Sequence, residues 1–152
     1  MKNKLKKVVS SIMAVASLAV GVTGINASAA NTGNKYFNDY SIVPSTSWTR
    51  LYQTDSKQDN TRVYLTIYSA SRAVRVHTLG ISSDGSEHVC TTNTSGAYCV
   101  QGPEYLISNS IYGNYSKADL KFYSVSSYYG DSISGAWSPD SIQEYGHYYN
   151  FV

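Results

Sequence analysis

The stretch that decides the fold reads Arg62-Val-Tyr-Leu-Thr-Ile-Tyr-Ser-Ala-Ser-Arg-Ala-Val-Arg-Val-His-Thr-Leu79. In its first half, Arg62–Tyr68, apolar residues alternate with polar or aromatic ones. Val63, Leu65 and Ile67 therefore share one side of an extended chain. This period of two predicts a β-strand with one face in a core.

The second half, Ala73–Leu79, repeats the pattern. Val74 and Val76 share one face, and His77 falls on the opposite face, where we expect it to be solvated. Between the halves, Ser69–Arg72 has the composition of a turn. The whole stretch predicts two neighbouring antiparallel strands.

Similar short segments recur at intervals of about ten residues on both sides, and no helical period persists for two turns. Fifteen tyrosines and many β-branched residues also favour extended structure. We therefore predict an all-β, antiparallel β-sandwich or barrel-like domain. The other expected strands are Tyr36–Ile42, Trp48–Gln53, Glu87–Cys90, Ala97–Gln101, Pro103–Ile107, Ala118–Val125, Ser132–Trp137 and, at an edge, Tyr145–Val152.

The two cysteines flank a turn signal, Asn93-Thr-Ser-Gly96. A hairpin folded at this turn places Cys90 opposite Cys99, with Cβ atoms about 4.5–5.5 Å apart, close to disulfide reach. A metal site or a nucleophile are the alternatives, but two thiols without clustered histidines are poor zinc ligands. The spacing therefore predicts a hairpin disulfide, Cys90–Cys99.

The N-terminus has the composition of a secretory signal peptide. Four lysines within the first seven residues precede an apolar run over residues 8–25 and the small residues Ala27-Ser-Ala-Ala30. An uncleaved membrane anchor is the alternative, but serine, glycine and threonine interrupt the run and no stop-transfer pattern follows. We expect residues 1–30 to be a signal peptide, cleaved after Ala29 or Ala30.

The remaining residues, 31–152, number about 122 and suit a single secreted β domain. They carry eight basic and ten acidic residues, a net charge of about −2, and no basic cluster. Nucleic acid is therefore not an expected partner, and attraction to anionic lipid is not indicated. Without a cysteine at the cleavage site or a C-terminal sorting pattern, we expect an extracellular, released protein.

Catalytic patterns are weak in this sequence. Gly130-Asp-Ser-Ile-Ser-Gly135 is one residue longer than a nucleophile elbow and is better interpreted as a turn leading into a strand. The three histidines, His77, His88 and His147, lack metal-ligand spacing, so we expect them to be surface residues. We predict a protein that is not an enzyme and that uses neither a cofactor nor a metal.

Acidic residues offer two further candidate sites, a glycosidase carboxylate pair and a calcium loop. For both, the spacing favours solvated turn residues instead. The residues concerned are Asp131, Asp140 and Glu144 for the glycosidase, and Asp55, Asp59 and Asn60 for calcium.

Aromatic residues crowd the second half of the chain. Tyrosine combines a large, rigid contact area with a polar tip, which suits sugar stacking and protein interfaces. The alternative is that these rings only cover a small sandwich and its edges. The predicted binding surface consists of Tyr112, Tyr128, Tyr129, Trp137, Tyr148 and Tyr149.

Two C-terminal segments resemble known families. Ser134-Gly-Ala-Trp-Ser-Pro-Asp-Ser141 looks like the closing segment of an uncharacterised family of small secreted proteins from Gram-positive bacteria. Tyr148-Tyr-Asn-Phe151 is similar to the C-terminus of lactococcin-like bacteriocins, which are small β-sandwiches. The second resemblance implies antagonism between bacteria.

These observations favour a secreted, non-enzymatic protein that acts at a cell surface, with bacteriocin-like antagonism as one form. Its partner would be a surface protein, glycan or membrane. The alternative is a carbohydrate- or cell-wall-binding module, such as an adhesin or matrix component. A small secreted hydrolase is a third hypothesis. Open sheet edges also permit a homo-oligomer.

Overall fold

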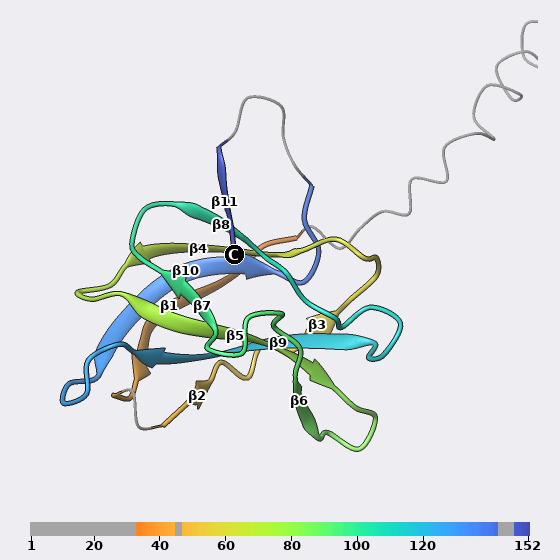
Figure 1. Cartoon of the computed structure of the whole chain (residues 1–152), viewed down its shortest axis with the longest axis horizontal. Coiled ribbons are helices and arrows are strands. Elements are labelled where there is room, and N and C mark those ends of the chain that lie inside the picture. The colour runs from red at the N-terminus through yellow and green to blue at the C-terminus, as the bar shows by residue number, and fades with distance from the viewer. Residues whose placement is uncertain (1–32, 45–46, 143–147) are drawn as a thin grey trace, which may run out of the picture.

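Strands make up all the regular structure that can be described. The computed structural model describes residues 33–44, 47–142 and 148–152, and each regular element within them is a β-strand (Figure 1). The all-β prediction is confirmed. The strands are β1 (Lys35–Ile42), β2 (Thr49–Arg50), β3 (Asp55–Ser56), β4 (Val63–Ser69), β5 (Val74–Ile81), β6 (Glu87–Val89), β7 (Ala97–Cys99), β8 (Glu104–Ile107), β9 (Lys117–Ser124), β10 (Asp131–Ser138) and β11 (Tyr149–Phe151).

The strands form two curled sheets. The first has the order β1-β10-β4-β8-β11, and the second has the order β2-β9-β5-β6, with β3 paired to β9 and β7 to β5. Register shifts between Phe37 and Tyr40 in β1, and between Ser134 and Gly135 in β10, interrupt the first sheet. Such bulges bend a strand and increase its twist, which explains the curl.

One apolar core lies between the two sheets. Val63, Leu65 and Ile67 of β4 are fully buried in it, as their alternation predicts. The rings of Phe37 from the first sheet and Phe122 from the second contact each other, with centroids 5.7 Å apart. Burying each such side chain stabilises the fold by about 1.5–3 kcal/mol, so this layer holds the sheets together.

Several predicted strands are present with nearly the expected bounds. Tyr36–Ile42, Pro103–Ile107, Ala118–Val125 and Ser132–Trp137 correspond to β1, β8, β9 and β10. Trp48–Gln53 is reduced to the two residues of β2, and the short strand β3 was not predicted.

The predicted pairing of β4 with β5 is wrong. β4 pairs with β10 and β8 in the first sheet, whereas β5 pairs with β9, β6 and β7 in the second. The turn at Ser69–Arg72 therefore carries the chain from one sheet to the other. Both strands bury apolar side chains in the same cluster, β4 from the first sheet and β5, through Val74 and Val76, from the second. They therefore lie in different sheets around one core and do not pair with each other.

The predicted disulfide is also absent, because the hairpin that would create it does not form. β9 pairs with β5 along its whole length. β6 and β7 pair with β5 as well, at Leu79–Ile81 and Val74–Val76 respectively, so they follow one another along its other edge. The Asn93–Gly96 turn is present, with the Gly96 N–H donating to the Asn93 carbonyl at 2.9 Å. It connects two strands, β6 and β7, that lie end to end along one edge of β5 and do not pair with each other.

The separation of the cysteines follows from this register. The Cys90 N–H donates to the Thr78 carbonyl, and Cys99 lies opposite Val74. Four residues along a strand span about 13 Å, well beyond the Cα separation that a disulfide allows. Both cysteines are buried and unpaired.

The C-terminal strand is an edge strand but runs parallel to its neighbour. β11 pairs with β8, with Tyr149 opposite Glu104 and Phe151 opposite Leu106. The part of the predicted strand at residues 145–147 lies outside the described residues. A parallel neighbour requires a long connection, which the chain between β8 and β11 provides.

Gly135 of β10 fits a position that has no room for a side chain. A Cβ there would lie 2.3 Å from the Thr66 carbonyl oxygen and 2.7 Å from the Phe37 ring. The close approach of β10 to its neighbours therefore depends on this glycine. The Gly130–Gly135 segment was predicted to be a turn leading into a strand, but residues 131–135 already belong to β10.

Both thiols should be free in the purified protein. We expect alkylation of the denatured chain without reductant to add two labels. In the folded chain labelling should be slow, because burial raises the pKa of Cys90 and raises that of Cys99 to about 12, which suppresses the reactive thiolate. Labelling of the denatured chain only after reduction would contradict the strand register.

Gly135→Ala should destabilise the fold through its clash with β4. We expect the free energy of unfolding, measured by urea denaturation, to fall by about 1–3 kcal/mol. Ser132→Ala, at an exposed position of the same strand, is the matched control and should change it by less than about 0.5 kcal/mol. Equal stabilities for the two variants would show that β10 does not approach β4 in this way.

Candidate functional site

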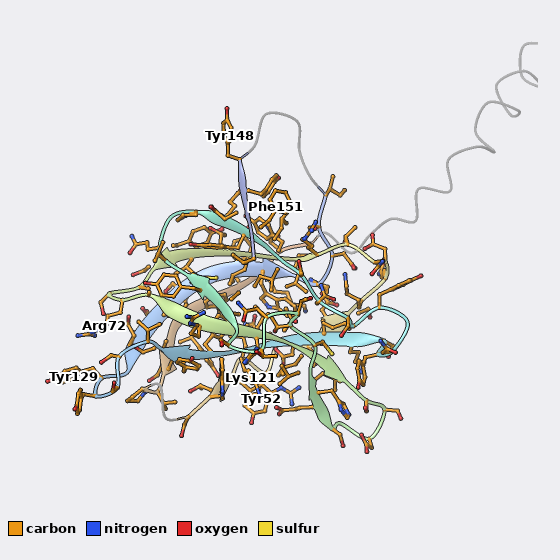
Figure 2. The ribbon with its side chains drawn as sticks, in the orientation of Figure 1. Tyr52, Arg72, Lys121, Tyr129, Tyr148 and Phe151 are labelled. Atoms are coloured by element: carbon orange, nitrogen blue, oxygen red, sulfur yellow. The ribbon has the colours of Figure 1, made fainter. Side chains whose placement is uncertain are left out.

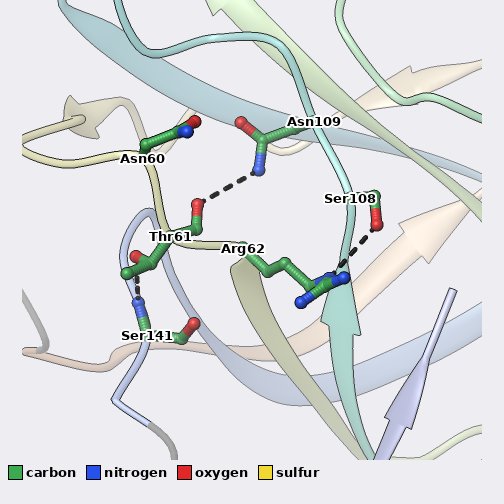
Figure 3. Close-up of a pocket in the computed structure, with 6 residues that line it drawn as sticks. All are labelled: Asn60, Thr61, Arg62, Ser108, Asn109 and Ser141. Carbon is green, nitrogen blue, oxygen red and sulfur yellow. Dashed lines mark hydrogen bonds between the residues drawn. The ribbon is translucent and has the colours of Figure 1, made fainter.

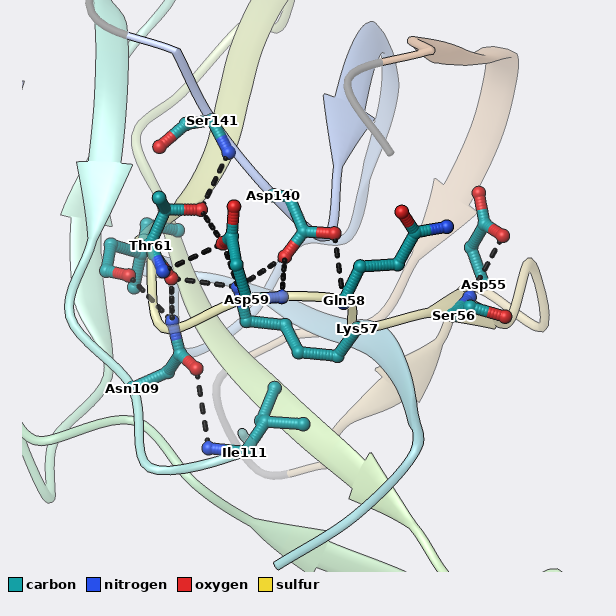
Figure 4. A network of polar contacts seen from close by, with 11 residues as sticks. Asp55, Ser56, Lys57, Gln58, Asp59, Thr61, Asn109, Ile111, Asp140 and Ser141 are labelled. Carbon is teal, nitrogen blue, oxygen red and sulfur yellow. Dashed lines mark hydrogen bonds and ion pairs between the residues drawn. The ribbon is translucent and has the colours of Figure 1, made fainter. Parts of the chain in front are cut away.

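A buried ion pair joins the loop before β4 to the segment after β10. Lys57 Nζ lies 2.7 Å from Asp140 Oδ1, and both side chains are 0 % exposed (Figure 4). Asp140 was predicted to be a solvated turn residue, and this prediction is wrong. Its position just after β10 directs the carboxylate inward, against the loop that begins at Lys57.

Backbone groups of the same loop complete the environment of the ion pair. Lys57 Nζ also donates to the Thr61 carbonyl at 2.7 Å. Asp140 Oδ2 accepts from the Gln58 N–H at 3.0 Å, and Oδ1 accepts from the Asp59 N–H at 3.4 Å. Charges removed from water are tolerated when they are paired and hydrogen-bonded, and these contacts meet that condition.

Asp59 extends the network towards the surface. Its Oδ1 accepts from both the N–H and the hydroxyl of Thr61 and lies 3.9 Å from Lys57 Nζ. Burial by itself would raise the pKa of the Asp59 carboxyl. The hydrogen bonds from Thr61, the contact with Asp140 and the charge of Lys57 outweigh burial and hold the pKa below its usual range. Asp59 is therefore a carboxylate at neutral pH.

A polar pocket of about 520 Å³ lies beside this network (Figure 3). One wall is the loop that leads into β4, a second is the segment after β8, and a third follows Asp140. The described side chains that line it are amides, hydroxyls and one guanidinium, and none of them is a carboxylate. They are Asn60, Thr61, Arg62, Ser108, Asn109 and Ser141.

Arg62 connects the pocket to the C-terminal strand. Its Nε donates to Ser108 Oγ at 3.2 Å, and its guanidinium carbon lies 5.0 Å from the centre of the Phe151 ring. The Ser108 N–H donates in turn to the Val152 carbonyl at 2.7 Å, which fixes the chain end against β8. Hydrogen-bonding groups therefore line the pocket, and Arg62 links it to the aromatic ring of Phe151.

The predicted aromatic surface is not one surface. Trp137 is 0 % exposed and donates its indole N–H to Gln53 Oε1 at 3.3 Å, so it belongs to the core and its place in a binding surface was predicted wrongly. Tyr129 and Tyr148 lie on different parts of the molecule, at the lower left and at the top of Figure 2. The other members are Tyr128 beside Tyr129, Tyr112 in the loop after β8, and Tyr149, which is half-buried in β11.

Several exposed aromatic rings are stacked with cations instead. Arg72 lies 5.3 Å from the Tyr129 ring, and Arg50 lies 4.8 Å from the Tyr52 ring. Each such contact contributes about 0.5–1 kcal/mol at an exposed position. These pairs occupy separate parts of the surface, so each ring has its own local packing partner.

His77 is buried, contrary to prediction. Its ring contacts that of Trp48, with centroids 4.2 Å apart, and its Nδ1 lies 3.2 Å from Thr91 Oγ1. The outer face of β5 is covered by these residues, so alternation along the strand does not bring solvent exposure. Burial, with a smaller contribution from the charge of Lys121, lowers the pKa of His77 to about 4.

His88 contacts a different part of the protein. His88 is exposed, as predicted, and stacks on the Tyr115 ring with centroids 4.8 Å apart. His147 lies outside the described residues. His77 does not form the histidine–carboxylate pair that the hydrolase hypothesis requires, because its side-chain polar partner among the described residues is Thr91.

The two described candidates for a glycosidase carboxylate pair, Asp131 and Asp140, are not brought together. Asp131 accepts from Ser71 Oγ and the Arg72 N–H at the start of β10, whereas Asp140 follows its end. The strand between them spans about 25 Å. Glu144 lies outside the described residues.

The acidic residues considered for a calcium loop have other partners. Asp55 lies 3.6 Å from Lys35 Nζ, Asp59 accepts from Thr61, and Asn60 lines the pocket. The described residues hold no group of three or more histidine, cysteine, aspartate or glutamate side chains arranged for a metal ion. They also include no helix with the length and apolarity needed to cross a membrane.

Sequence patterns did not mark Lys57 and Arg62 as site residues. Both flank the acidic loop that was considered for calcium, and the only signal in the sequence is that this polar loop directly precedes the strongest strand. Their importance depends on Ser108 and Asp140, which are distant in sequence.

Comparison with known proteins identifies a family without an assigned activity. Residues 25–141 match the family described as "Protein of unknown function (DUF2712)". The match contains the ion pair and the pocket-lining residues and ends before β11. It agrees with the uncharacterised family predicted from Ser134–Ser141, whereas Gram-positive origin and likeness to bacteriocins remain predictions. No curated protein and no solved structure matches the chain.

The stability of the fold should depend on pH through His77. Between about pH 6.5 and 4 the unfolded chain binds a proton at His77 that the folded chain does not bind. The free energy of unfolding should therefore fall as pH drops through this window, by about 2–3 kcal/mol in total. His77→Gln should lose this part of the pH dependence in urea denaturation. An unchanged pH profile in the variant would contradict a buried neutral imidazole.

Proposed function

Because the chain belongs to the DUF2712 family, whose function is unknown, we propose a function from its own site: it is a secreted, non-enzymatic protein that binds an anionic glycan at a cell surface. The observation that carries this proposal is the polar pocket with Arg62 at its side and the Phe151 ring beside it. The expected signal peptide at residues 1–30 supports secretion.

The pocket chemistry suits a ligand rich in hydroxyl groups. Amide and hydroxyl side chains such as Asn60, Asn109 and Ser141 can both donate and accept hydrogen bonds, as sugar hydroxyls do. An adjacent aromatic ring offers a flat apolar surface for the C–H face of a sugar. A volume of about 520 Å³ lies in the usual range for small-ligand sites.

Arg62 favours a glycan that carries a negative group. Among the described residues its guanidinium makes a hydrogen bond only through Nε, to Ser108. Its terminal nitrogens can therefore donate in parallel to a carboxylate or a phosphate. Among the described residues that line the pocket, none is a carboxylate that would compete for them. Wall polysaccharides with uronic, muramic or phosphate groups have this chemistry.

Bacteriocin-like antagonism is a second candidate, favoured by the exposed aromatic residues of the C-terminal segment. Tyr148 is 96 % exposed and Phe151 is 56 % exposed, at the edge of the first sheet. Attachment to a wall glycan would place these rings at the surface of a target cell. Antagonism and adhesion therefore share the binding step and differ in its consequence.

Loss of the Arg62 charge should weaken binding to cell walls. In sedimentation assays with purified Gram-positive walls, we expect Arg62→Gln to lower affinity roughly 10- to 100-fold, since a charge-assisted hydrogen bond contributes about 1.5–3 kcal/mol. Arg72→Gln is the matched control, because Arg72 also stacks on an exposed ring but lies away from the pocket. Soluble acidic sugars should compete for binding. Equal wall binding by both variants would refute glycan binding at this pocket.

Counts of surviving cells separate the two candidates. The protein is added to related Gram-positive strains at concentrations that saturate wall binding. Death of the cells that depends on Arg62 would support antagonism, and binding without killing would support an adhesin or matrix component.

A further inference from the structure

The buried ion pair has the components of a covalent cross-link. We propose that Lys57 and Asp140 condense to an intramolecular isopeptide bond, with Asp59 transferring the protons. The bond would join the loop before β4 to the segment after β10. This inference concerns the ion pair and does not depend on the proposed glycan binding.

The reacting atoms are already close. Lys57 Nζ lies 2.7 Å from Asp140 Oδ1 (Figure 4). Because a carboxyl C–O bond is about 1.25 Å long, Nζ lies at most about 4 Å from Cγ, the carbon it must attack. Reacting groups held near 3–3.5 Å reach effective molarities of about 10⁵–10⁸ M. The fold therefore supplies the proximity that free amines and acids lack in water.

Both reacting side chains are removed from water, since each is 0 % exposed. A proton that moves within the pair leaves a free amine facing a carboxylic acid. Lysine amines in such environments act as nucleophiles. Exclusion of water also protects the resulting amide from hydrolysis.

The neighbouring groups match the needs of the condensation. Asp59 Oδ1, 3.9 Å from Lys57 Nζ, can accept a proton after a small shift or through one water molecule. The Gln58 N–H, 3.0 Å from Asp140 Oδ2, donates to the oxygen that becomes negative when Cγ is tetrahedral. One loop therefore supplies the nucleophile, the proton carrier and the stabilising N–H.

The reaction balances within the ion pair. The ammonium and the carboxylate together contain the atoms of an amide and one water molecule. The Nζ–Cγ bond forms and the Cγ–Oδ1 bond breaks, while two protons pass from Nζ to Oδ1, which leaves as water. Asp59 accepts and returns protons and is unchanged. No oxidant or external reactant is required.

Intact mass measured under denaturing conditions tests the bond directly. We expect the full chain, after its N-terminus has been determined, to weigh about 18 Da less than its sequence, through the loss of one water. Digestion should give one branched peptide that joins Lys57 to Asp140. An intact mass equal to that of the sequence would overturn the proposal.

Two variants locate the chemistry. Lys57→Arg keeps the positive charge but cannot form the amide, so it should have the full mass. A loss of 18 Da that persists in this variant would assign the dehydration to another site, such as a succinimide, and would overturn the proposal. Asp59→Asn keeps the ion pair and should slow bond formation at least tenfold in folded protein. An unchanged rate would refute the role of Asp59.

Discussion

The buried pair Lys57–Asp140 is the interaction on which the rest of the site depends. Removing two charges from water costs several kcal/mol per ion, and the fold offsets this only through good geometry and complete hydrogen bonding. The carbonyl of Thr61 and the N–H of Gln58 therefore have to stay in place. As a result the loop before β4 is fixed, and Arg62, directly before this strand, is held at the pocket.

A second constraint is that both edges of β5 are occupied. β9 pairs with it on one side, and β6 and β7 follow one another on the other side. This arrangement separates Cys90 from Cys99 by the length of four residues. It also brings Trp48 and Thr91 over the outer face of the strand, where they bury His77. Three wrong expectations, about pairing, disulfide and histidine, therefore have one structural cause.

The functional surface that we propose is a polar pocket rather than a broad aromatic face. The tyrosines are distributed over the molecule, and some are stacked with arginines, as Tyr129 is with Arg72. Trp137 fills the core. The pocket lined by Arg62 is concave and polar, and for this reason glycan binding is the function that we propose.

The sequence by itself determined that the chain is all-β and where its longer strands lie, because alternation is a local property of an extended chain. It placed Val63, Leu65 and Ile67 in the core for the same reason. Only the tertiary structure decided which strands pair, and it decided the site. Lys57 meets Asp140 across more than eighty residues of sequence, and no local pattern encodes such a contact. The Lys57–Asp140 contact forms as a buried ion pair only when the packed sheets exclude water from both charges.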